Sequence, residues 1–186
     1  RGEDPVAVNC DSIQVYRGLE TLSGAATKVE RARLEHRLLS FVEPGEEFSA
    51  GRYAELAHAE IDSLLNAGRR PIVVGGTGLY LRAALADLDL RPPVPAEIRE
   101  EVEREITERG PEALHGELEP ELAETVDPSD RKRIARLTEL SRVGIEAARG
   151  GEGLWTAQLR HPTLLVGLTM DREELARRID ARVNGM

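Results

Sequence analysis

Three short apolar runs constrain the fold of this chain more than any other feature. They span Val6 to Val8, Ile72 to Val74 and Leu164 to Leu168, and each contains β-branched residues. Each run is too short for a helix, so the pattern predicts buried strands. From Arg52 to Asn66 apolar residues instead follow a helical period, and Gly68 then supplies a stop. Strand, helix and strand in this order predict a parallel sheet with helices on its faces.

The stretch after the second run follows a different pattern. It holds no strand candidate, and glycines and prolines break it into short helical pieces. Ile98, Val102 and Ile106 recur at four-residue spacing and predict one buried helix face. A glycine-rich stretch at 148–155 is predicted to be a flexible return to the last strand. We therefore predict an α/β core with an all-helical insertion: the core is 1–90 with 155–186, and the insertion is 91–154.

The composition limits the possible partners. A net charge of −9 and an aromatic content of 3% oppose RNA binding over a broad surface, so any RNA contact requires a local basic patch. The single cysteine, Cys10, excludes an internal disulfide and favours a reducing, cytoplasmic setting. No apolar run approaches the roughly 20 residues that span a bilayer, so we expect no membrane association.

Polar residues follow the first predicted strand. Asp11 and Ser12 end the apolar run, and Gln14 comes shortly after them. In an open α/β sheet the residues just beyond a strand's carboxyl end line the ligand crevice, so Asp11 is the first candidate for contact with a substrate. The alternative is that Asp11 and Ser12 only cap the following turn. The pattern alone does not choose between the two.

A glycine-rich turn follows the second predicted strand. The residues from Gly75 to Gly78 read GGTG, and a helical pattern resumes at Leu79. Glycines let the backbone approach a ligand closely, and the free amides of a helix's first turn favour an anion, to which Thr77 could add a hydroxyl. A tight turn without a ligand is the alternative. No Gly-x-x-x-x-Gly-Lys-[Ser/Thr] phosphate loop occurs in the sequence.

Two later helical segments carry arginines. In "DRKRIAR" we expect Ser129 to cap the helix, Ile134 to face the core, and Arg133 and Arg136 to form a local basic ridge. A solvated charged face is the alternative. In "DREELARRIDARV" Arg182 lies at the edge of an apolar stripe, so it either reaches solvent or meets an anion. The members of that stripe are Leu175, Ile179, Val183 and Met186.

Five segments, taken together and in order, resemble the tRNA dimethylallyltransferases. They are "DSIQVYRG", "HRLLSFVEPGEEFSAGRY", "RPIVVGGTGLYLRAAL", "DRKRIAR" and "DREELARRIDARV", and they cover nearly the whole chain. The resemblance implies an α/β fold, a phosphate-loop NTPase-like parallel sheet with flanking helices. It also implies that the helical insertion grips the anticodon stem-loop of tRNA.

The resemblance further implies an activity and roles for individual residues. Dimethylallyl diphosphate would donate its prenyl group to N6 of an adenosine beside the anticodon, with the base flipped out of its stack. Asp11 matches the general base, and Thr77 and Arg182 match catalytic positions near the diphosphate. Mg²⁺ is the expected cofactor, held in a phosphate loop, and the protein is expected to be a monomer. The positions that match tRNA-contacting residues are Asp11, Ser12, Ile13, Gln14, Lys132, Arg133, Ile134, Ala135 and Arg136.

The chain departs from the family pattern in three places. It starts after the family's phosphate loop, it stops after the Arg182 helix, and it has "ETLSGAAT" where the family usually has a loop with Lys and Pro. Contacts of that loop are expected to differ. Two other functions stay open: a sister enzyme that prenylates free adenine nucleotides, and a non-catalytic relative that binds RNA. The helical insertion and the Arg133 and Arg136 ridge favour tRNA, because a mononucleotide needs no such grip.

The first strand of the family fold lies centrally in the sheet, so its absence would expose its neighbours. We therefore expect the 186-residue chain to be a truncated piece of a longer protein and to be inactive by itself. A turnover assay of the 186 residues with dimethylallyl diphosphate and tRNA tests this expectation. Normal turnover would contradict it.

Overall fold

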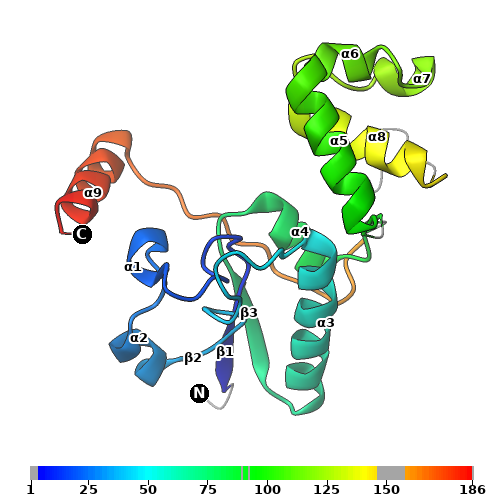
Figure 1. Cartoon of the computed structure of the whole chain (residues 1–186). Helices are drawn as coiled ribbons and strands as arrows, with labels where there is room; N and C mark the ends of the chain where they lie inside the picture. Colours follow the sequence, from blue (N-terminus) through cyan, green and yellow to red (C-terminus); the bar gives the residue numbers. More distant parts are fainter. Residues whose placement is uncertain (1–3, 89, 92, 146–157, 186) are drawn as a thin grey trace. The chain divides into compact units, whose positions relative to one another are not determined.

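The computed structural model describes residues 4–88, 90–91, 93–145 and 158–185, and the chain divides into two compact units (Figure 1). One unit comprises Arg1–Leu88 with Thr156–Met186, and the other comprises Asp89–Trp155. This division lies close to the predicted one. The predicted flexible return at 148–155 lies outside the described residues.

Among the described residues, three parallel strands form the sheet of the first unit, in the order β2–β1–β3. Val6 and Val8 of the central strand are fully buried. The two apolar runs predicted as the first strands are confirmed, whereas β2 was not predicted because its sequence, EHR, holds no apolar residue. The strands are β1 (Pro5–Asn9), β2 (Glu35–Arg37) and β3 (Arg70–Val74).

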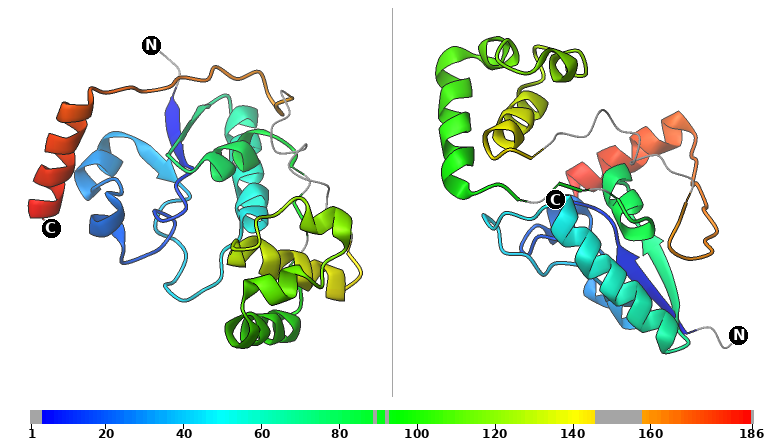
Figure 2. Two further views of the ribbon diagram at one scale, coloured as in Figure 1. Left: turned by 90° about the horizontal axis from the view of Figure 1, so that it is seen from above. Right: turned by 90° about the vertical axis from the view of Figure 1, so that its right-hand side faces the viewer.

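Helices lie on either side of these strands (Figure 2). α1 (Glu20–Ser23) and α2 (Lys28–Arg33) lie on one side, and α3 (Ala50–Asn66) and α4 (Gly78–Leu85) lie on the other. The apolar face of α3 is buried, and the helix ends just before Gly68, whose φ of 70° suits a residue without a side chain. The predicted helix and its stop are therefore confirmed.

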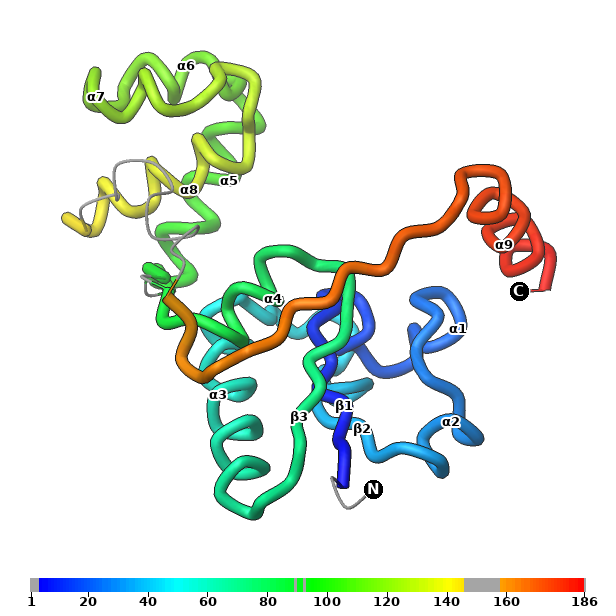
Figure 3. Tube along the Cα trace, turned by 180° about the vertical axis from the view of Figure 1, so that it is seen from behind, coloured from blue at the N-terminus to red at the C-terminus, as the bar shows by residue number. Residues whose placement is uncertain are grey.

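The third predicted strand, Leu164–Leu168, is not formed. The segment is extended (Figure 3). Leu164 and Leu168 are 86% and 95% exposed. Ile72 and Val74 of β3 are also exposed, and β3 pairs only with β1 among the described residues. The prediction was wrong because an apolar run supplies strand propensity, whereas a strand exists only when a neighbour supplies the hydrogen bonds.

The last predicted helix is present as α9 (Arg172–Asn184), but its apolar stripe is not buried. Asp171 caps it, because its side chain accepts hydrogen bonds from the first-turn amides of residues 173 and 174. Leu175, Ile179 and Val183 are 47%, 52% and 61% exposed, so the predicted apolar stripe is present on α9 but is not covered in the described structure. Met186 lies outside the described residues.

The described part of the second unit is helical, as predicted. Its buried core includes Val102, Ile106 and Ile134. The cap of α8 was predicted wrongly: Asp130, not Ser129, accepts the hydrogen bond from the amide of Arg133, at 3.1 Å. The helices are α5 (Ala96–Arg109), α6 (Pro111–His115), α7 (Pro120–Ala123) and α8 (Arg131–Arg142).

Within the first unit, an ionic cluster fastens the segment that leads to α9 to α3 and to the residues just after α4. Arg160 lies 2.7 Å from Asp62 and 2.8 Å from Asp87, and its amide donates to the carbonyl of Leu85 at 2.8 Å. His161 lies 2.7 Å from the second oxygen of Asp62. The hydrogen bond from His161, together with the charge of Arg160, holds the pKa of Asp62 below its usual range.

Asp62→Asn should therefore lower the melting temperature at pH 7 by about 1–3 °C, the range for a partly exposed ion-pair cluster. A carboxyl with a lowered pKa stabilises the fold above its unfolded-state pKa, and this contribution is lost as the pH falls through the folded-state pKa. Thermal denaturation of both proteins between about pH 3 and pH 7 should thus show the difference fading in acid. Asp180→Asn on the exposed face of α9 is the control, and an undiminished difference in acid would contradict the assignment.

Candidate functional site

The carboxyl ends of β1 and β3 meet at one edge of the sheet and bring Asp11, Ser12 and Thr77 together. The amide of Cys10 donates to the carbonyl of Val74 at 2.8 Å, which continues the β1–β3 pairing beyond β1. The amide of Ser12 donates to Oγ1 of Thr77 at 3.0 Å, and the Thr77 hydroxyl donates to Oγ of Ser12 at 3.2 Å. Two segments 65 positions apart in the sequence therefore share one site.

Gly75 makes this approach possible. A Cβ at this position would lie 2.5 Å from the carbonyl carbon of Cys10 and 2.7 Å from the amide nitrogen of Asp11. Such contacts lie far inside van der Waals distance, so only glycine fits without a shift of the backbone. Gly76, in contrast, has no atom within 4 Å of an added Cβ. Within the glycine-rich turn, Gly75 is therefore the residue that lies against the backbone just after β1.

The two carboxylate oxygens of Asp11 differ in their hydrogen bonds. Oδ1 accepts hydrogen bonds from the amides of Ile13 at 2.9 Å and Gln14 at 3.3 Å. This is the turn-capping role considered as an alternative in the sequence. Oδ2 has no hydrogen bond to any described residue. One oxygen thus fixes the orientation of the carboxylate, and the other is left to accept a proton.

Cys10 lies directly before Asp11 but does not suit nucleophilic chemistry. Its side chain is fully buried. Burial, together with the negative charge of Asp11, raises the pKa of the Cys10 thiol to about 11. A thiol that stays protonated is a poor nucleophile.

Asn9 is a site residue that the sequence analysis missed. Its Nδ2 donates to the carbonyls of Asp11 at 3.1 Å and Leu38 at 2.9 Å, and its Oδ1 accepts from the amide of Asp11 at 3.1 Å. The side chain is 5% exposed. A buried asparagine inside the apolar run VAVNC was the signal available in the sequence, since buried amides are almost always hydrogen-bonded.

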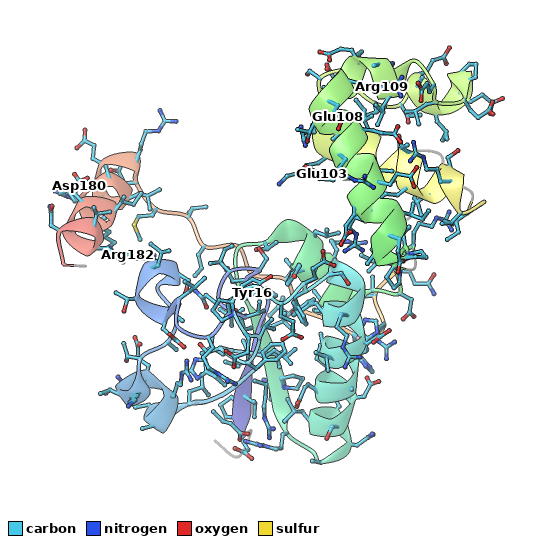
Figure 4. All side chains as sticks on the ribbon, in the orientation of Figure 1. Tyr16, Glu103, Glu108, Arg109, Asp180 and Arg182 are labelled. Atoms are coloured by element: carbon cyan, nitrogen blue, oxygen red, sulfur yellow. The ribbon has the colours of Figure 1, made fainter. Side chains whose placement is uncertain are left out.

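Arg182 lies at the end of α1 in the described structure. Its guanidinium donates to the carbonyl of Leu22 at the end of α1 and lies against Gly24 (Figure 4). Gln14 reaches the same helix end, where its Nε2 donates to the carbonyls of Ser23 at 3.3 Å and Gly24 at 3.4 Å. Carbonyls at a helix end have no partners within the helix and attract donors. The role of Arg182 near a diphosphate stays a prediction.

The basic residues of α8 divide by face. Arg131 pairs with Glu103 of α5, and Arg142 lies 2.8 Å from Glu105 of the same helix. These pairs hold α8 against α5. Arg133 is the most exposed of the ion-paired arginines on α8, with a side chain 71% exposed and a distance of 4.0 Å to Asp130.

The predicted tRNA-contacting segment of α8 therefore presents its residues unequally. Lys132 and Arg133 are exposed, whereas Ile134 is fully buried, as its place in the helical period predicted. Arg136 is half-buried: it lies 3.0 Å from Glu139, and its Nη2 lies 3.5 Å from the carbonyl of Arg91. Ala135 packs against the core of the second unit. Contact with a ligand through side chains is thus open to Lys132 and Arg133, and to Arg136 in part.

A cavity of about 590 Å³ lies beside the end of β1 in the first unit. Asn9, Gln14 and Val74 line it near the site, and Arg33 and His36 line it farther along the chain. Ile13, by contrast, is 49% exposed. The edge of the sheet thus offers both a partly open cavity and an exposed apolar side chain.

Within the described ranges, no group of three or more His, Cys, Asp or Glu residues could hold a metal ion. No helix in the same part of the chain combines the length and apolar character needed to cross a bilayer.

The sequence is similar to those of known proteins of one family. The family model described as IPP transferase matches residues 14–186. The chain is 41% identical over 188 residues to a tRNA dimethylallyltransferase of Rhodopseudomonas palustris, covering 96% of this chain and 57% of that protein. It is 38% identical to a tRNA dimethylallyltransferase of Thermobifida fusca, with 96% and 56% covered. The chain thus spans little more than half the length of these curated relatives.

Solved structures give the same result for the fold. The full-length tRNA isopentenylpyrophosphate transferase from Bacillus halodurans matches with a TM-score of 0.59 and 29% identity, over 97% of this chain and 57% of that one. A eukaryotic dimethylallyltransferase acting on tRNA matches with a TM-score of 0.72 and 23% identity, over 97% and 46%. At that identity the second likeness shows the fold alone. The predicted phosphate-loop-like α/β fold is confirmed.

The glycine at the site gives a direct test of the geometry. Gly75→Ala should lower the free energy of unfolding by about 1–3 kcal/mol, the usual range for overpacking, because the added methyl group would press on the backbone of residues 10 and 11. Gly76→Ala, one position later with open space around it, should change the unfolding free energy far less. Urea denaturation measures both, and equal effects would show that the close approach is absent.

Proposed function

Since the chain belongs to the IPP transferase family, we propose that the protein transfers a dimethylallyl group from dimethylallyl diphosphate to N6 of an adenosine beside the anticodon of tRNA. The observation that carries the proposal is the carboxylate of Asp11, fixed through Oδ1 and open at Oδ2, next to Thr77 at the carboxyl ends of two parallel strands. Substrates of open α/β sheets bind at this edge. Two relatives named above carry the same activity in their names.

In the proposed reaction Asp11 is the general base. The lone pair of N6 attacks C1 of the prenyl group, the N6–C1 bond forms, and the bond from C1 to the diphosphate oxygen breaks. The proton that N6 gives up passes to Oδ2 of Asp11, while diphosphate leaves with the bonding electron pair. Because Oδ1 is held by two amides, the carboxylate needs no reorientation to accept the proton.

Thr77 and the start of α4 suit the leaving diphosphate. Thr77 is the N-cap residue of α4, yet its side chain makes no capping hydrogen bond and instead contacts Ser12. The first-turn amides of α4 therefore have no side-chain cap, and a helix start of this kind favours an anion. We propose that Arg182 joins this site, because a diphosphate is a stronger acceptor than the carbonyl of Leu22 that Arg182 now contacts.

Mg²⁺ is part of the proposal through the diphosphate. The ion binds mainly through substrate phosphates and water, with one or two side chains, so it needs no protein cage of three or more ligands. It would supply charge neutralisation on the leaving group. None of the steps assigned to Asp11 or Thr77 depends on it.

The proposed tRNA contact uses the outward face of α8. Lys132 and Arg133 are exposed on α8, and Ile13 offers an exposed apolar side chain near Asp11. We propose that these residues contact the anticodon stem-loop, with Ser12 and Gln14 nearer the flipped base, and that the protein acts as a cytoplasmic monomer. A basic ridge on a chain of net charge −9 favours this substrate over a free adenine nucleotide.

The base assignment predicts a loss of rate without a loss of binding. Asp11→Asn keeps an oxygen that can cap the turn but cannot accept the proton, so in the complete protein kcat should fall by about 10²–10⁴-fold. The affinity for tRNA should stay within a few-fold, as measured by filter binding. Asp180→Asn is the matched control on α9. A variant at position 11 that keeps most of its rate would exclude Asp11 as the base.

The RNA contact predicts a change in salt dependence. Arg133→Ala should weaken tRNA binding by roughly 3–10-fold at low salt and reduce the slope of log K against log salt by about 1, because one phosphate contact is lost. Arg136→Ala should lower the melting temperature as well, because Glu139, 7% exposed, would lose its partner. Arg172→Ala on α9 is the control for the salt dependence, since it also removes one exposed arginine. An unchanged salt slope in Arg133→Ala would contradict the proposed contact.

A further inference from the structure

We infer that Asn9 is the positioning residue of Asp11: its side-chain amide sets the place of the base relative to the bound adenine. The inference rests on the proposed function and deepens it by one residue. Asn9 need not touch either substrate. It acts through the backbone on both sides of Asp11.

The side chain of Asn9 forms hydrogen bonds with the main chain on both sides of the Asp11 Cα. Oδ1 accepts from the amide of Asp11 at 3.1 Å, and Nδ2 donates to the carbonyl of Asp11 at 3.1 Å. With both main-chain polar groups of Asp11 engaged by one side chain, the Cα of Asp11 is held in place. The carboxylate is then oriented separately, through Oδ1, by the amides of residues 13 and 14.

Asn9 is itself held from two other parts of the fold. Nδ2 also donates to the carbonyl of Leu38 at 2.9 Å, in the segment that follows β2. The main-chain carbonyl of Asn9 accepts the hydroxyl of Tyr53, a fully buried residue of α3, at 2.8 Å. Asp11 is therefore tied, through one residue, to β2 on one side of β1 and to α3 on the other.

Leu38 adds a sign that this link is under constraint. Its φ is 56°, a left-handed conformation that is unfavourable for a leucine. The carbonyl that faces Asn9 belongs to this residue. A backbone strained in this way persists only where its surroundings fix it, and the hydrogen bond from Nδ2 of Asn9 is one such contact.

The chemistry of the amide explains why no other side chain of this size does the same. At this position one side chain must accept one hydrogen bond, from the amide of Asp11, and donate two, to the carbonyls of residues 11 and 38. A primary amide provides both the acceptor and the donors in one planar group. Aspartate has the same shape and keeps the acceptor, but it cannot donate to the carbonyls of residues 11 and 38. Those carbonyls would then be left without a partner beside a new negative charge.

The test uses single-turnover prenyl transfer by the complete protein, with saturating tRNA and dimethylallyl diphosphate. Asn9→Ala and Asn9→Asp should each lower the rate constant by roughly 10–100-fold, because a misplacement of up to about 1 Å can cost as much as 100-fold. The amplitude of the turnover and the Kd for tRNA should stay within about 2-fold. Loss of folded protein would lower the amplitude instead of the rate constant. Asn66→Asp, the same change at the exposed end of α3, should leave both unchanged.

A double variant separates positioning from any independent effect. If Asn9 acts through Asp11, then adding Asn9→Asp to Asp11→Asn should slow the reaction by less than about 2-fold further, since coupled residues are not additive. Wild-type rate constants in both Asn9 variants, or losses that multiply in the double variant, would overturn the inference while leaving the base in place. A wild-type rate in Asp11→Asn would overturn the base and the inference together.

Discussion

The parallel pairing of β1 with β3 is the interaction on which the rest of this site depends. It continues past β1 through the hydrogen bond from Cys10 to Val74, and it brings two chain segments to within backbone contact at Gly75. A side chain at that one position would push the two strand ends apart. The hydrogen bonds between Ser12 and Thr77 are possible only because that contact is so close.

The site is organised by hydrogen bonds to the main chain and not by ion pairs. Asp11, Asn9 and Gln14 all direct their side chains to backbone amides or carbonyls. Such contacts fix direction as well as distance, and salt screens them far less than it screens surface charge pairs. The two interpretations of Asp11 in the sequence, a cap and a contact for substrate, are therefore compatible, since each uses a different oxygen.

Local sequence patterns predicted the elements that depend on local residues. They failed where the formation of a strand depends on pairing with another segment. β1, β3, α3 and the helices of the second unit follow from apolar period and length. β2 carries only Glu35, His36 and Arg37, so no pattern marks it, and it exists because β1 offers a free edge. Leu164–Leu168 has the right residues for a strand, but no pairing supports it in the described structure. Sequence cannot report such a partner, because pairing is a property of two segments.

The same limit applies to the site. Asp11 and Thr77 were predicted from their places after strands, and the structure brings them together through Ser12. Asn9 was missed because the only sequence signal was one polar residue inside the apolar run VAVNC, and its hydrogen-bond partners Leu38 and Tyr53 lie far away in the sequence. The resemblance places Arg182 near the diphosphate; in the structure its guanidinium contacts the carbonyl of Leu22 at the end of α1, and its role at the diphosphate stays a prediction.

The division of arginines on α8 has a consequence for how the sequence of such a helix can evolve. Arg131 and Arg142 are committed to the acidic residues of α5, whereas Arg133 faces outward with little to hold it. Substitutions at the outward positions can thus alter ligand preference with little effect on folding. Substitutions at the inward positions change the stability of the fold before they can change binding. One helix can in this way keep its scaffold while its binding face drifts toward a new partner.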